Sequence, residues 1–465
     1  MSPGRAIADG TSGFSCHREA SVKPSQPADG RPRIVIIGAG FAGFHCARWL
    51  DRHFAASSEV VLVNPADHTV YSALLPDVVG GVVDPACVAT PLAASLPSST
   101  VVVGVVASVD ATAQTCTVRT TDGDDQQLAW DRLVLNPGSV TETFGIAGVH
   151  EYAHGFKTIA EAIYLREHIL RQLQLAGSAS DADARDGLGS FVVVGGGFTG
   201  LELAAQGHKL ARAALRQHRR LESESVRWTV IEAGPTALGQ FPAKLASRAL
   251  SRMRQTGVDV RLGTPVAEVA PGHVRLVNGE TLTTRTVVWT AGVAPAPLIS
   301  EVGLAVEHGR LIVDDALQAR DHPHVFALGD AAAVPDLARP GQITAQTAQH
   351  AQRQGVMAAR NVAASLENRE TQAYKHRDLG FAVDLTGRNA IATPLGIRVS
   401  GFIAKLAGRA YHLLALPSGR LRVLSDWVNA LITGPQIIHL GLVDERSATI
   451  QAEAGSGHDL EPRTP

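Results

Sequence analysis

The chain has 465 residues, of which 45% are hydrophobic and 18% are charged, and its formal net charge is −2. This length and composition predict two or three globular domains with a large core. The near-neutral charge gives no overall electrostatic reason to expect nucleic acid or another polyanion as a partner.

The N-terminal segment, residues 1–30, is rich in Ser, Pro, Gly and Ala and lacks the apolar core of a signal peptide. We expect a disordered extension there. The four cysteines form no CxxC pair, which is typical of an intracellular protein with reduced thiols. The sequence predicts no metal site.

A first glycine fingerprint follows the apolar run that begins at Arg33, and its glycines Gly38, Gly40 and Gly43 have GxGxxG spacing. Gly38 allows a tight turn, Gly40 lets a pyrophosphate approach the backbone, and Gly43 lets the next helix pack on the strand. The helix N-terminus then offers N–H groups to the phosphates. The pattern predicts a strand, a turn and a helix that bind a dinucleotide.

The second strand is expected over Val60–Val63, and its end should carry an acid that binds a ribose. Asn64 stands there, 21 residues after Gly43, close to the usual spacing of about 20. Its amide oxygen can accept one ribose hydroxyl, although an amide is a weaker acceptor than a carboxylate.

A loop and short helix are predicted for Tyr71–Gly81, and this segment has no cysteine. Without a thiol relay beside the cofactor, electrons must leave directly to an external acceptor. Residues 101–135 predict a small antiparallel insert with a turn at 122–124. Residues 170–190 are polar and predict a connector.

A second fingerprint at Gly195, Gly197 and Gly200 predicts a second dinucleotide fold. Glu232 ends its next strand, 32 residues after Gly200, which is about a dozen more than usual. A carboxylate there would accept the adenosine ribose hydroxyls and repel a 2′-phosphate, so NADH is expected rather than NADPH. The alternative is that Glu232 only caps a turn.

Two further acids are candidate site residues. Glu202 lies in the first turn of the second helix, where the helix dipole alone favours an acid. It could also face the nicotinamide and orient its carboxamide or relay a proton. Asp330 follows a strand in FALGDAA and would reach a flavin's ribityl chain, or else only form a turn.

From about Arg33 to Val443 the chain resembles the flavoproteins with two dinucleotide-binding domains, and among them the type II NADH dehydrogenases. These are single-subunit NADH:quinone oxidoreductases. The resemblance rests on GAGFAG, YSALLPDVVGG, HGFKTIAEA, GGGFTGLELA, VVWTAGV, FALGDAA and TAQHAQRQG.

The resemblance implies an α/β fold with two Rossmann-like domains, an FAD domain interrupted by an NADH domain, and a C-terminal α+β region ending in amphipathic helices. The expected division is a disordered extension (1–30), an FAD domain (31–150 and 285–370), an NADH domain (151–284), a membrane-associating or dimerisation region (371–443) and a disordered tail (444–465). FAD would bind at Gly38, Gly40, Gly43, Asn64 and Asp330, and NADH at Gly195, Gly197, Gly200, Glu202 and Glu232.

The resemblance also places a quinone beside a helix starting near Thr347, at a motif similar to AQxAxQQG. In this chain Gln349, Ala351, Gln354 and Gly355 match, while Arg353 replaces a glutamine. The residue spacing by itself predicts one polar helical face, formed by Gln342, Gln346, Gln349 and Arg353. This face would bind quinone carbonyls or would simply be exposed to solvent. We expect Gln346, Gln349, Arg353 and Gln354 at the quinone, and Gln349 and Glu202 as catalytic residues.

Two amphipathic helices are predicted near the C-terminus, over Val399–Leu416 and Leu421–Ile432. The first should carry apolar side chains on one face and Lys405, Arg409 and His412 on another, which suits an interfacial helix rather than a spanning one. Trp427 in the second favours a headgroup boundary. Alternatively, both helices pack on the protein's own core or on a dimer partner.

The sequence thus predicts an FAD-dependent enzyme in which hydride passes from NADH to FAD, and two electrons then pass to menaquinone or ubiquinone without proton pumping. It would lie peripherally on the cytoplasmic face of the cell membrane, with a homodimer left open. One alternative is a soluble NADH-dependent reductase of a small redox protein, with an exposed basic docking face and no liposome binding. Another is a non-catalytic regulator that binds flavin or NADH without turnover.

Overall fold

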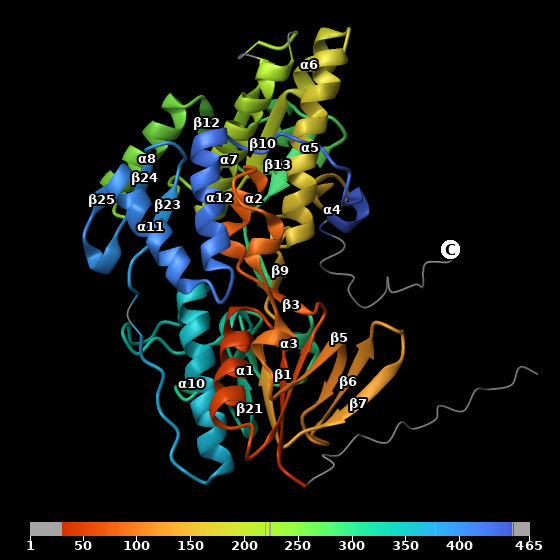
Figure 1. Ribbon diagram of the computed structural model, residues 1–465, viewed down its shortest axis with the longest axis vertical. Coiled ribbons are helices and arrows are strands. Elements are labelled where there is room, and N and C mark those ends of the chain that lie inside the picture. The colour runs from red at the N-terminus through yellow and green to blue at the C-terminus, as the bar shows by residue number, and fades with distance from the viewer. Residues whose placement is uncertain (1–29, 219, 223–224, 377, 449, 451–465) are drawn as a thin grey trace, which may run out of the picture.

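The computed structural model describes residues 30–450 apart from 219, 223–224, 377 and 449. The expected extension at 1–29 and the tail beyond residue 450 lie outside the described residues. Figure 1 shows two units of sheet and helices stacked along the long axis, with the C-terminal helices beside the upper unit.

The first sheet has the strand order β20-β21-β8-β1-β2-β5-β6-β7. Its strand β1 (Arg33–Ile37) is buried at every residue, as expected for a parallel strand covered on both faces. It pairs in parallel with β2 (Glu59–Asn64) and β8 (Arg132–Leu135), and β8 pairs in parallel with β21 (His322–Ala327). Two distant stretches of chain therefore build one sheet, which confirms the interrupted domain.

The predicted antiparallel insert is confirmed. Strands β5 (Thr100–Asp110), β6 (Thr115–Thr120) and β7 (Asp125–Ala129) continue the first sheet, with β6 antiparallel to both neighbours. At the opposite edge, β20 (Gln318–Ala319) pairs with β21.

Helices α1 (Phe41–His53) and α10 (Ala348–Leu366) lie side by side against the first sheet (Figure 1). They pack closely at Gly355, where a Cβ atom would lie 2.1 Å from the carbonyl oxygen of Ala42. This glycine lets the AQHAQRQG segment pack directly on the helix that follows the first glycine loop.

The second sheet has four parallel strands in the order β12 (Val258–Arg261), β11 (Arg227–Ile231), β10 (Ser190–Val194) and β16 (Thr286–Trp289). Helices α7 (Phe198–Ala214) and α8 (Ala243–Gln255) belong to the same unit. Because β16 pairs with β10, the expected domain boundary after residue 284 comes too early.

The connector expected over residues 170–190 is instead helical. Helix α5 (Ile159–Ser178) starts at a capping box in which Thr158 and Glu161 exchange hydrogen bonds, and α6 (Ala182–Leu188) follows. Reciprocal capping satisfies two N–H groups at the helix start. The apolar side chains of Leu165, Ile169 and Leu173 are buried on one face of α5, so tertiary packing outweighs the polar local composition.

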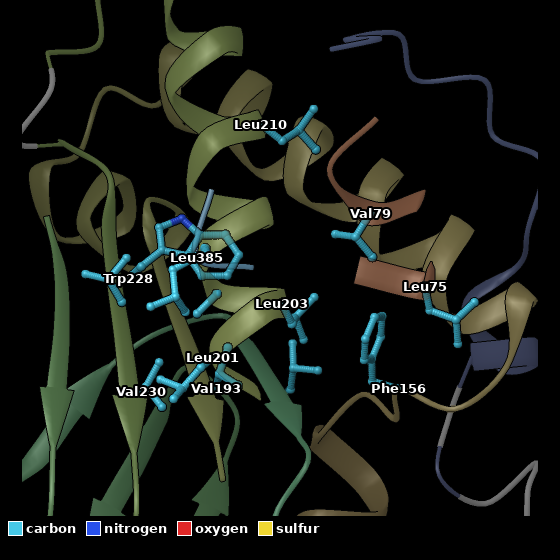
Figure 2. Packing of buried hydrophobic residues seen from close by; sticks show 14 of the residues in the cluster. Leu75, Val79, Phe156, Val193, Leu201, Leu203, Leu210, Trp228, Val230 and Leu385 are labelled. Carbon is cyan, nitrogen blue, oxygen red and sulfur yellow. The ribbon is translucent and has the colours of Figure 1, made fainter. Parts of the chain in front are cut away.

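One hydrophobic core joins the three parts of the chain. Figure 2 shows Val193 of β10, Leu203 of α7 and Trp228 of β11 packed near Leu75 and Leu385, which come from other parts of the chain. Leu75 belongs to α2 (Leu75–Val79), near the first glycine unit, and Leu385 to the C-terminal region. The second unit is therefore packed against its neighbours through buried side chains.

The C-terminal region begins with a small antiparallel sheet of β23 (Ala382–Asp384), β24 (Ala390–Ala392) and β25 (Val399–Ser400). Helices α11 (Phe402–Ala415) and α12 (Arg420–Thr433) follow. Both predicted amphipathic helices are confirmed. No helix in the described part of the chain is long and apolar enough to cross a bilayer.

Beyond α12, the described residues between 440 and 450 return to the second unit and pack against α5. The carboxylate of Glu167 accepts hydrogen bonds from the backbone N–H groups of Leu440 (3.2 Å) and Leu442 (3.0 Å). The short helix η7 (Glu445–Ala448) follows, and Ala448 and Ile450 are buried. The expectation of a disordered tail is wrong for the described residues from 444 to 450, because the side chains of Ala448 and Ile450 are buried against the rest of the protein.

The remaining elements are short. They are β3 (His68–Val70) with β4 (Ala89–Pro91), β9 (Ser139–Thr141) with β17 (Val293–Pro295), β13 (Val266–Ala270) with β14 (His273–Leu276) and β15 (Thr281–Thr283), β18 (Val306–Glu307) with β19 (Arg310–Ile312) and β22 (Ala332–Ala333), and the helices η1 (Ser72–Leu74), η2 (Pro85–Val88), α3 (Leu92–Ser95), α4 (Val149–Tyr152), η3 (Leu215–Gln217), α9 (Leu298–Glu301), η5 (Gly329–Ala331) and η6 (Pro394–Gly396).

Candidate functional site

The first glycine loop cannot carry side chains at two of its glycines. Gly38 has φ +91°, and a Cβ atom there would lie 2.1 Å from the carbonyl oxygen of Asn136. A Cβ at Gly43 would lie 1.9 Å from the carbonyl oxygen of Gly38. Gly40 is exposed and forms the N-cap of α1 without a side-chain hydrogen bond. The helix N-terminus is thus open to a pyrophosphate.

The second loop repeats this geometry. Gly195 has φ +116°, and its Cβ would lie 2.6 Å from the carbonyl oxygen of Thr290. A Cβ at Gly200 would lie 2.0 Å from the carbonyl oxygen of Gly195, whereas nothing lies within 4 Å of one at Gly197. Gly197 is the uncapped N-cap of α7. The residues present therefore fit one dinucleotide at each loop.

Asn64 and Glu232 occupy the same place in the two units, at or just after the end of the second strand. The backbone N–H of Ala39 donates to Oδ1 of Asn64 (2.8 Å), and that of Gly196 donates to Oε2 of Glu232 (2.7 Å). The second oxygen of Glu232 accepts from the N–H of Gly234 (2.7 Å). Glu232 therefore does cap a turn, as the alternative expected, but it also contacts the glycine loop.

Asn64 lacks a second carboxylate oxygen, and its amide nitrogen is directed away from the loop. Its Nδ2 donates to the carbonyl oxygen of Ala66 (2.8 Å), which fixes Oδ1 towards Ala39. One lone pair of Oδ1 is then left for a ribose hydroxyl. The first site is neutral at the position where the second carries a negative charge.

Asn136 is a site residue that the sequence reasoning missed. It follows β8 directly, is 4% exposed, and its backbone bounds Gly38. A Cβ at Gly329 would lie 2.7 Å from the side-chain amide of the same residue. Asn136 thus joins the first glycine loop to the turn that carries Asp330. The polar sequence NPGS directly after an apolar strand could have indicated a site residue at this position.

Asp330 lies in η5, directly after Gly329, at the end of the first sheet. Its Oδ2 accepts a hydrogen bond from Oγ of Ser139 (2.8 Å), and Nζ of Lys157 lies 3.1 Å from the same hydroxyl. The carboxylate thus has a polar neighbour but is only partly buried. The structure places Asp330 near the first loop, as expected for a group that meets a flavin's sugar chain.

Gln354 holds the Asp330 turn in place. Its Oε1 accepts from the N–H of Gly329 (2.8 Å), and its Nε2 donates to Oγ1 of Thr344 (3.1 Å). The side chain is 1% exposed. Its amide is therefore satisfied within the protein and positions the backbone beside the first loop.

The glutamine stripe expected on one helical face is wrong for two of its members. Thr347 is the N-cap of α10, and its Oγ1 accepts from the N–H of His350. Gln342 and Gln346 therefore precede the helix. Gln346 lies in the loop, where its amide donates to the carbonyl oxygen of Asp330 (3.4 Å). The helix begins where a capping threonine is available. Two of the four polar residues therefore lie before the helix and two lie on it.

Gln349 and Arg353 do lie one turn apart on α10, and both contact the protein itself. The Gln349 amide donates to the carbonyl oxygen of Gly380 (2.6 Å) and accepts from the N–H of Leu379 (3.0 Å). Nη1 of Arg353 donates to the carbonyl oxygen of Gln349 (3.0 Å). Burial raises the pKa of Tyr411 on α11, and the neighbouring Arg353 guanidinium opposes this shift. These two residues link α10 to the C-terminal region.

A charged pocket lies where α2, α7, β23, α11 and α12 meet. It is lined by Asp77, Glu202, Gln206, Asp384, Lys405, Arg409, His412 and Trp427, among others. The backbone N–H of Asp384 donates to Oε1 of Glu202 (2.8 Å), and Nζ of Lys405 lies 3.0 Å from the Asp384 carboxylate. The pocket thus collects three acidic and two basic side chains from three parts of the chain.

Burial raises the pKa of Glu202 well above its usual value, and the negative charges of Asp384 and Asp77 raise it further. The hydrogen bond from the Asp384 backbone opposes this shift. Burial also lowers the pKa of His412 to about 4, so this imidazole is neutral at pH 7. A buried carboxyl group with a raised pKa, surrounded by other titratable side chains, is a candidate for proton transfer.

Asp77 is the second residue that the sequence reasoning missed. It lies within the apolar YSALLPDVVGG segment and is 8% exposed. The indole Nε1 of Trp427 donates to its Oδ2 (2.9 Å), and the Gln206 amide donates to its Oδ1. Burial raises the pKa of Asp77. The expectation of Trp427 at a headgroup boundary is therefore wrong, because its indole is 4% exposed and has an internal partner.

Helix α11 directs charged side chains inwards, whereas α12 buries Val423 and Trp427, and both helices expose apolar side chains. On α11, Lys405 and Arg409 face Asp384, and His412 Nδ1 lies 3.1 Å from the Tyr71 hydroxyl. The exposed apolar side chains on these helices and the neighbouring segments are Leu395, Ile397, Phe402, Ile403, Leu406, Leu414, Leu421, Leu424, Val428, Leu431, Ile432, Ile438, Leu440 and Leu442. Exposed apolar side chains that gather on neighbouring elements, as on α11 and α12, often mark an interaction site.

Two dinucleotide folds, one inserted within the other, define a class of oxidoreductases that use two nucleotide cofactors. Residues 32–355 match the pyridine nucleotide-disulphide oxidoreductase family. A type II NADH:quinone oxidoreductase of Mycobacterium tuberculosis is 30% identical over 426 residues, which cover 87% of this chain and 89% of that protein. The chain belongs to the type II NADH:quinone oxidoreductases within that family.

A second relative and a solved structure are also similar to this chain. A demethylphylloquinone reductase of Synechocystis is 29% identical over 86% of this chain and 98% of its own length. The solved structure of NDH2 from Plasmodium falciparum in complex with NADH matches with a TM-score of 0.80 and 16% identity, and covers 88% of this chain and all of that one. This last likeness confirms the fold.

Proposed function

We infer that the chain is an FAD-dependent NADH:quinone oxidoreductase. The observation that carries this inference is the pair of glycine loops with matching geometry in a member of the type II family. The cysteine-free Tyr71–Gly81 segment supports an external acceptor rather than a thiol. The overall reaction is NADH plus one proton plus quinone giving NAD⁺ plus quinol, so hydride, electrons and protons balance.

FAD, when bound, accepts the hydride equivalent of NADH and passes two electrons to the quinone. The chain's own contribution is to bind and orient the partners. Gly38, Gly40 and Gly43 leave room for one pyrophosphate, and Asn64 and Asp330 would bind the sugar groups of FAD. Gly195, Gly197, Gly200 and Glu232 would hold NADH in the same manner in the second unit. The Glu232 carboxylate favours NADH over NADPH, since it would repel a 2′-phosphate.

We assign Glu202 a proton-handling role in the same site. Burial raises its pKa, so it keeps a proton to higher pH than an exposed glutamate does; the Asp384 backbone bonds to it, and Lys405 pairs with the Asp384 carboxylate. A group that can hold and release a proton would assist the uptake of one proton from solvent in each turnover. The quinone itself, menaquinone or ubiquinone, would bind beside α10.

At the quinone, Gln349 and Arg353 are the proposed contacts on the helix, with Gln346 on the preceding loop. Gln349 donates to a carbonyl oxygen at Gly380 in this structure, so a quinone carbonyl would replace that acceptor. Gln354 would act on the acceptor side indirectly, because its amide holds the Gly329 turn.

The outward apolar sides of α11 and α12 support a peripheral membrane location, which we place on the cytoplasmic face of the cell membrane. Helices with one apolar and one charged side lie in the plane of the interface. The same surface also suits a homodimer, in which two copies would cover each other's apolar side chains. Gel filtration and liposome flotation separate these two arrangements.

The decisive experiment is anaerobic stopped-flow absorbance of the flavin-loaded protein, mixed with NADH and then with a short-chain quinone analogue. Loss of flavin absorbance with NADH and its rapid return with quinone are expected. A return only with a small iron–sulfur protein, and never with quinone, would overturn the quinone assignment. No loss of absorbance with NADH would favour a regulator that binds nucleotides without turnover.

A further inference from the structure

A shallow basin between α8 and the C-terminal sheet is lined by three arginines. Arg248 and Arg252 lie one turn apart on α8, and Arg388 lies in the turn between β23 and β24. All three are exposed. Of the described residues that line the basin, none is Asp or Glu. Three positive charges are thus gathered in a chain whose net charge is −2.

The guanidinium groups are held by neutral partners. Nη1 of Arg248 lies 3.4 Å from Oγ of Ser400, and Nη1 of Arg252 donates to Oε1 of Gln255 (3.1 Å). Arg388 stacks over the Phe402 ring, 5.8 Å from its centroid. No ion pair with a described carboxylate involves any of the three, so their charges are available to an outside anion.

The basin opens directly onto the apolar surface. Ser400 and Gly401 line it, and α11 begins at the next residue with Phe402 and Ile403, which are 56% and 69% exposed. Leu395 and Ile397, between β24 and β25, are 77% and 65% exposed. Figure 1 shows α8, β24, β25 and α11 beside one another. A cationic basin at the edge of an exposed apolar surface matches a lipid, whose phosphate lies next to its acyl chains.

We propose that Arg248, Arg252 and Arg388 bind the phosphate of an anionic phospholipid headgroup while the neighbouring apolar side chains enter the acyl boundary. Guanidinium groups bind phosphate through paired hydrogen bonds. Cations close to an anionic membrane surface strengthen binding. An acidic redox protein is a less suitable occupant, because the exposed Phe402 and Ile403 would stay in water beside it. The proposal rests on the membrane location proposed above.

The test is co-sedimentation of the full-length protein with vesicles of phosphatidylcholine alone and with vesicles of equal parts phosphatidylcholine and phosphatidylglycerol. The triple variant R248Q/R252Q/R388Q should lose roughly fivefold in partitioning per arginine on anionic vesicles, or on the order of a hundredfold in total. It should bind the zwitterionic vesicles as the wild type does. The triple lysine variant should keep most of the anionic preference.

Arg360, an exposed arginine far along α10, provides the matched control R360Q, and circular dichroism checks folding. Inorganic phosphate at millimolar concentration should not release the protein from anionic vesicles, and release would assign the basin to free phosphate instead. Equal binding of the wild type to both vesicles would overturn the proposal and favour an acidic protein partner. Separately, I403S/L406S should weaken binding to both vesicles, and a wild type that binds neither would overturn the membrane location as well.

Discussion

The backbone N–H of Asp384 donates a 2.8 Å hydrogen bond to the carboxylate of Glu202. This bond joins the second turn of α7, in the NADH unit, to the small C-terminal sheet; the expectation that Glu202 lies in the first turn is therefore wrong by one residue. It places Glu202 in a pocket shared with Asp77 and Lys405. The same glutamate thus belongs to the nucleotide unit by sequence and to the interface with the C-terminal region by contact.

Glu202→Gln should alter the pH dependence of stability. Because the folded-state pKa of Glu202 is raised above its ordinary value of 4.5, the folded protein keeps a proton that the unfolded chain has lost. Stability is therefore expected to fall as pH rises above about 4.5 and to level off above the raised pKa. Glutamine cannot titrate, so the variant's melting temperature should fall less between pH 5 and 8 than that of the wild type. Identical slopes in differential scanning calorimetry would contradict the shift.

The same variant tests the proton-handling role. Loss of a general acid or base typically lowers turnover by 10²–10⁴-fold. We expect a fall in kcat of about a hundredfold, with a change in the pH profile, while the KM for NADH changes little. Unchanged kcat with an altered melting temperature would leave Glu202 a structural residue.

Glu232→Gln should weaken NADH binding without loosening FAD. The carboxylate binds the N–H groups of Gly196 and Gly234, and a charge-assisted hydrogen bond contributes about 1.5–3 kcal/mol. We expect the KM for NADH to rise about tenfold and the preference for NADH over NADPH to shrink, since the repelling charge is gone. Steady-state rates with both nucleotides measure this. An unchanged preference would show that specificity lies elsewhere.

Asn64→Ala is the counterpart at the first site. It removes the 2.8 Å bond from the Ala39 N–H, and one such bond contributes about 1 kcal/mol. FAD should then dissociate roughly fivefold more readily, which flavin fluorescence follows directly. The KM for NADH of the flavin-loaded variant should stay the same, and this contrast with Glu232→Gln separates the two sites.

Gln354→Ala and Gln346→Ala form a matched pair. The substitution is the same in both, and only the environment of the side chain differs. The buried Gln354 amide satisfies Gly329 and Thr344, so its loss should cost about 1–3 kcal/mol and loosen FAD. The exposed Gln346 makes one long bond to Asp330, and its truncation should cost less than about 0.5 kcal/mol. Equal losses in chemical denaturation would argue against a positioning role for Gln354.

Local patterns predicted the parts of the fold whose cause is local. Gly38 and Gly195 indicate tight turns because a side chain is sterically impossible at these positions. Both loops lie where the sequence predicted them. Glu232 was found despite its unusual spacing because β11 ends just before it. In each case the physical requirement falls on residues that are close in sequence.

The errors arise where the partner is far away in sequence. Amphipathic patterns predicted that α11 and α12 each have two different faces. They did not predict which side chains point inwards, because the inward contacts are with Asp384 and Asp77, which lie elsewhere in the sequence. Trp427 is internal for that reason. Ile450 was predicted to belong to a disordered tail because the core that it joins lies in the second unit. The predicted row of glutamines on one helical face was wrong because Thr347 caps the helix between its members.

The first sheet's discontinuity has a consequence for how the molecule forms. Strand β21 can pair with β8 only after the whole second unit has been made, so this pairing has a large sequence separation and is expected to be slow. The second sheet, from β10 to β16, is continuous and can form earlier. Asp330 and Gly38 therefore meet last, and flavin loading should be the closing step of maturation rather than its nucleus.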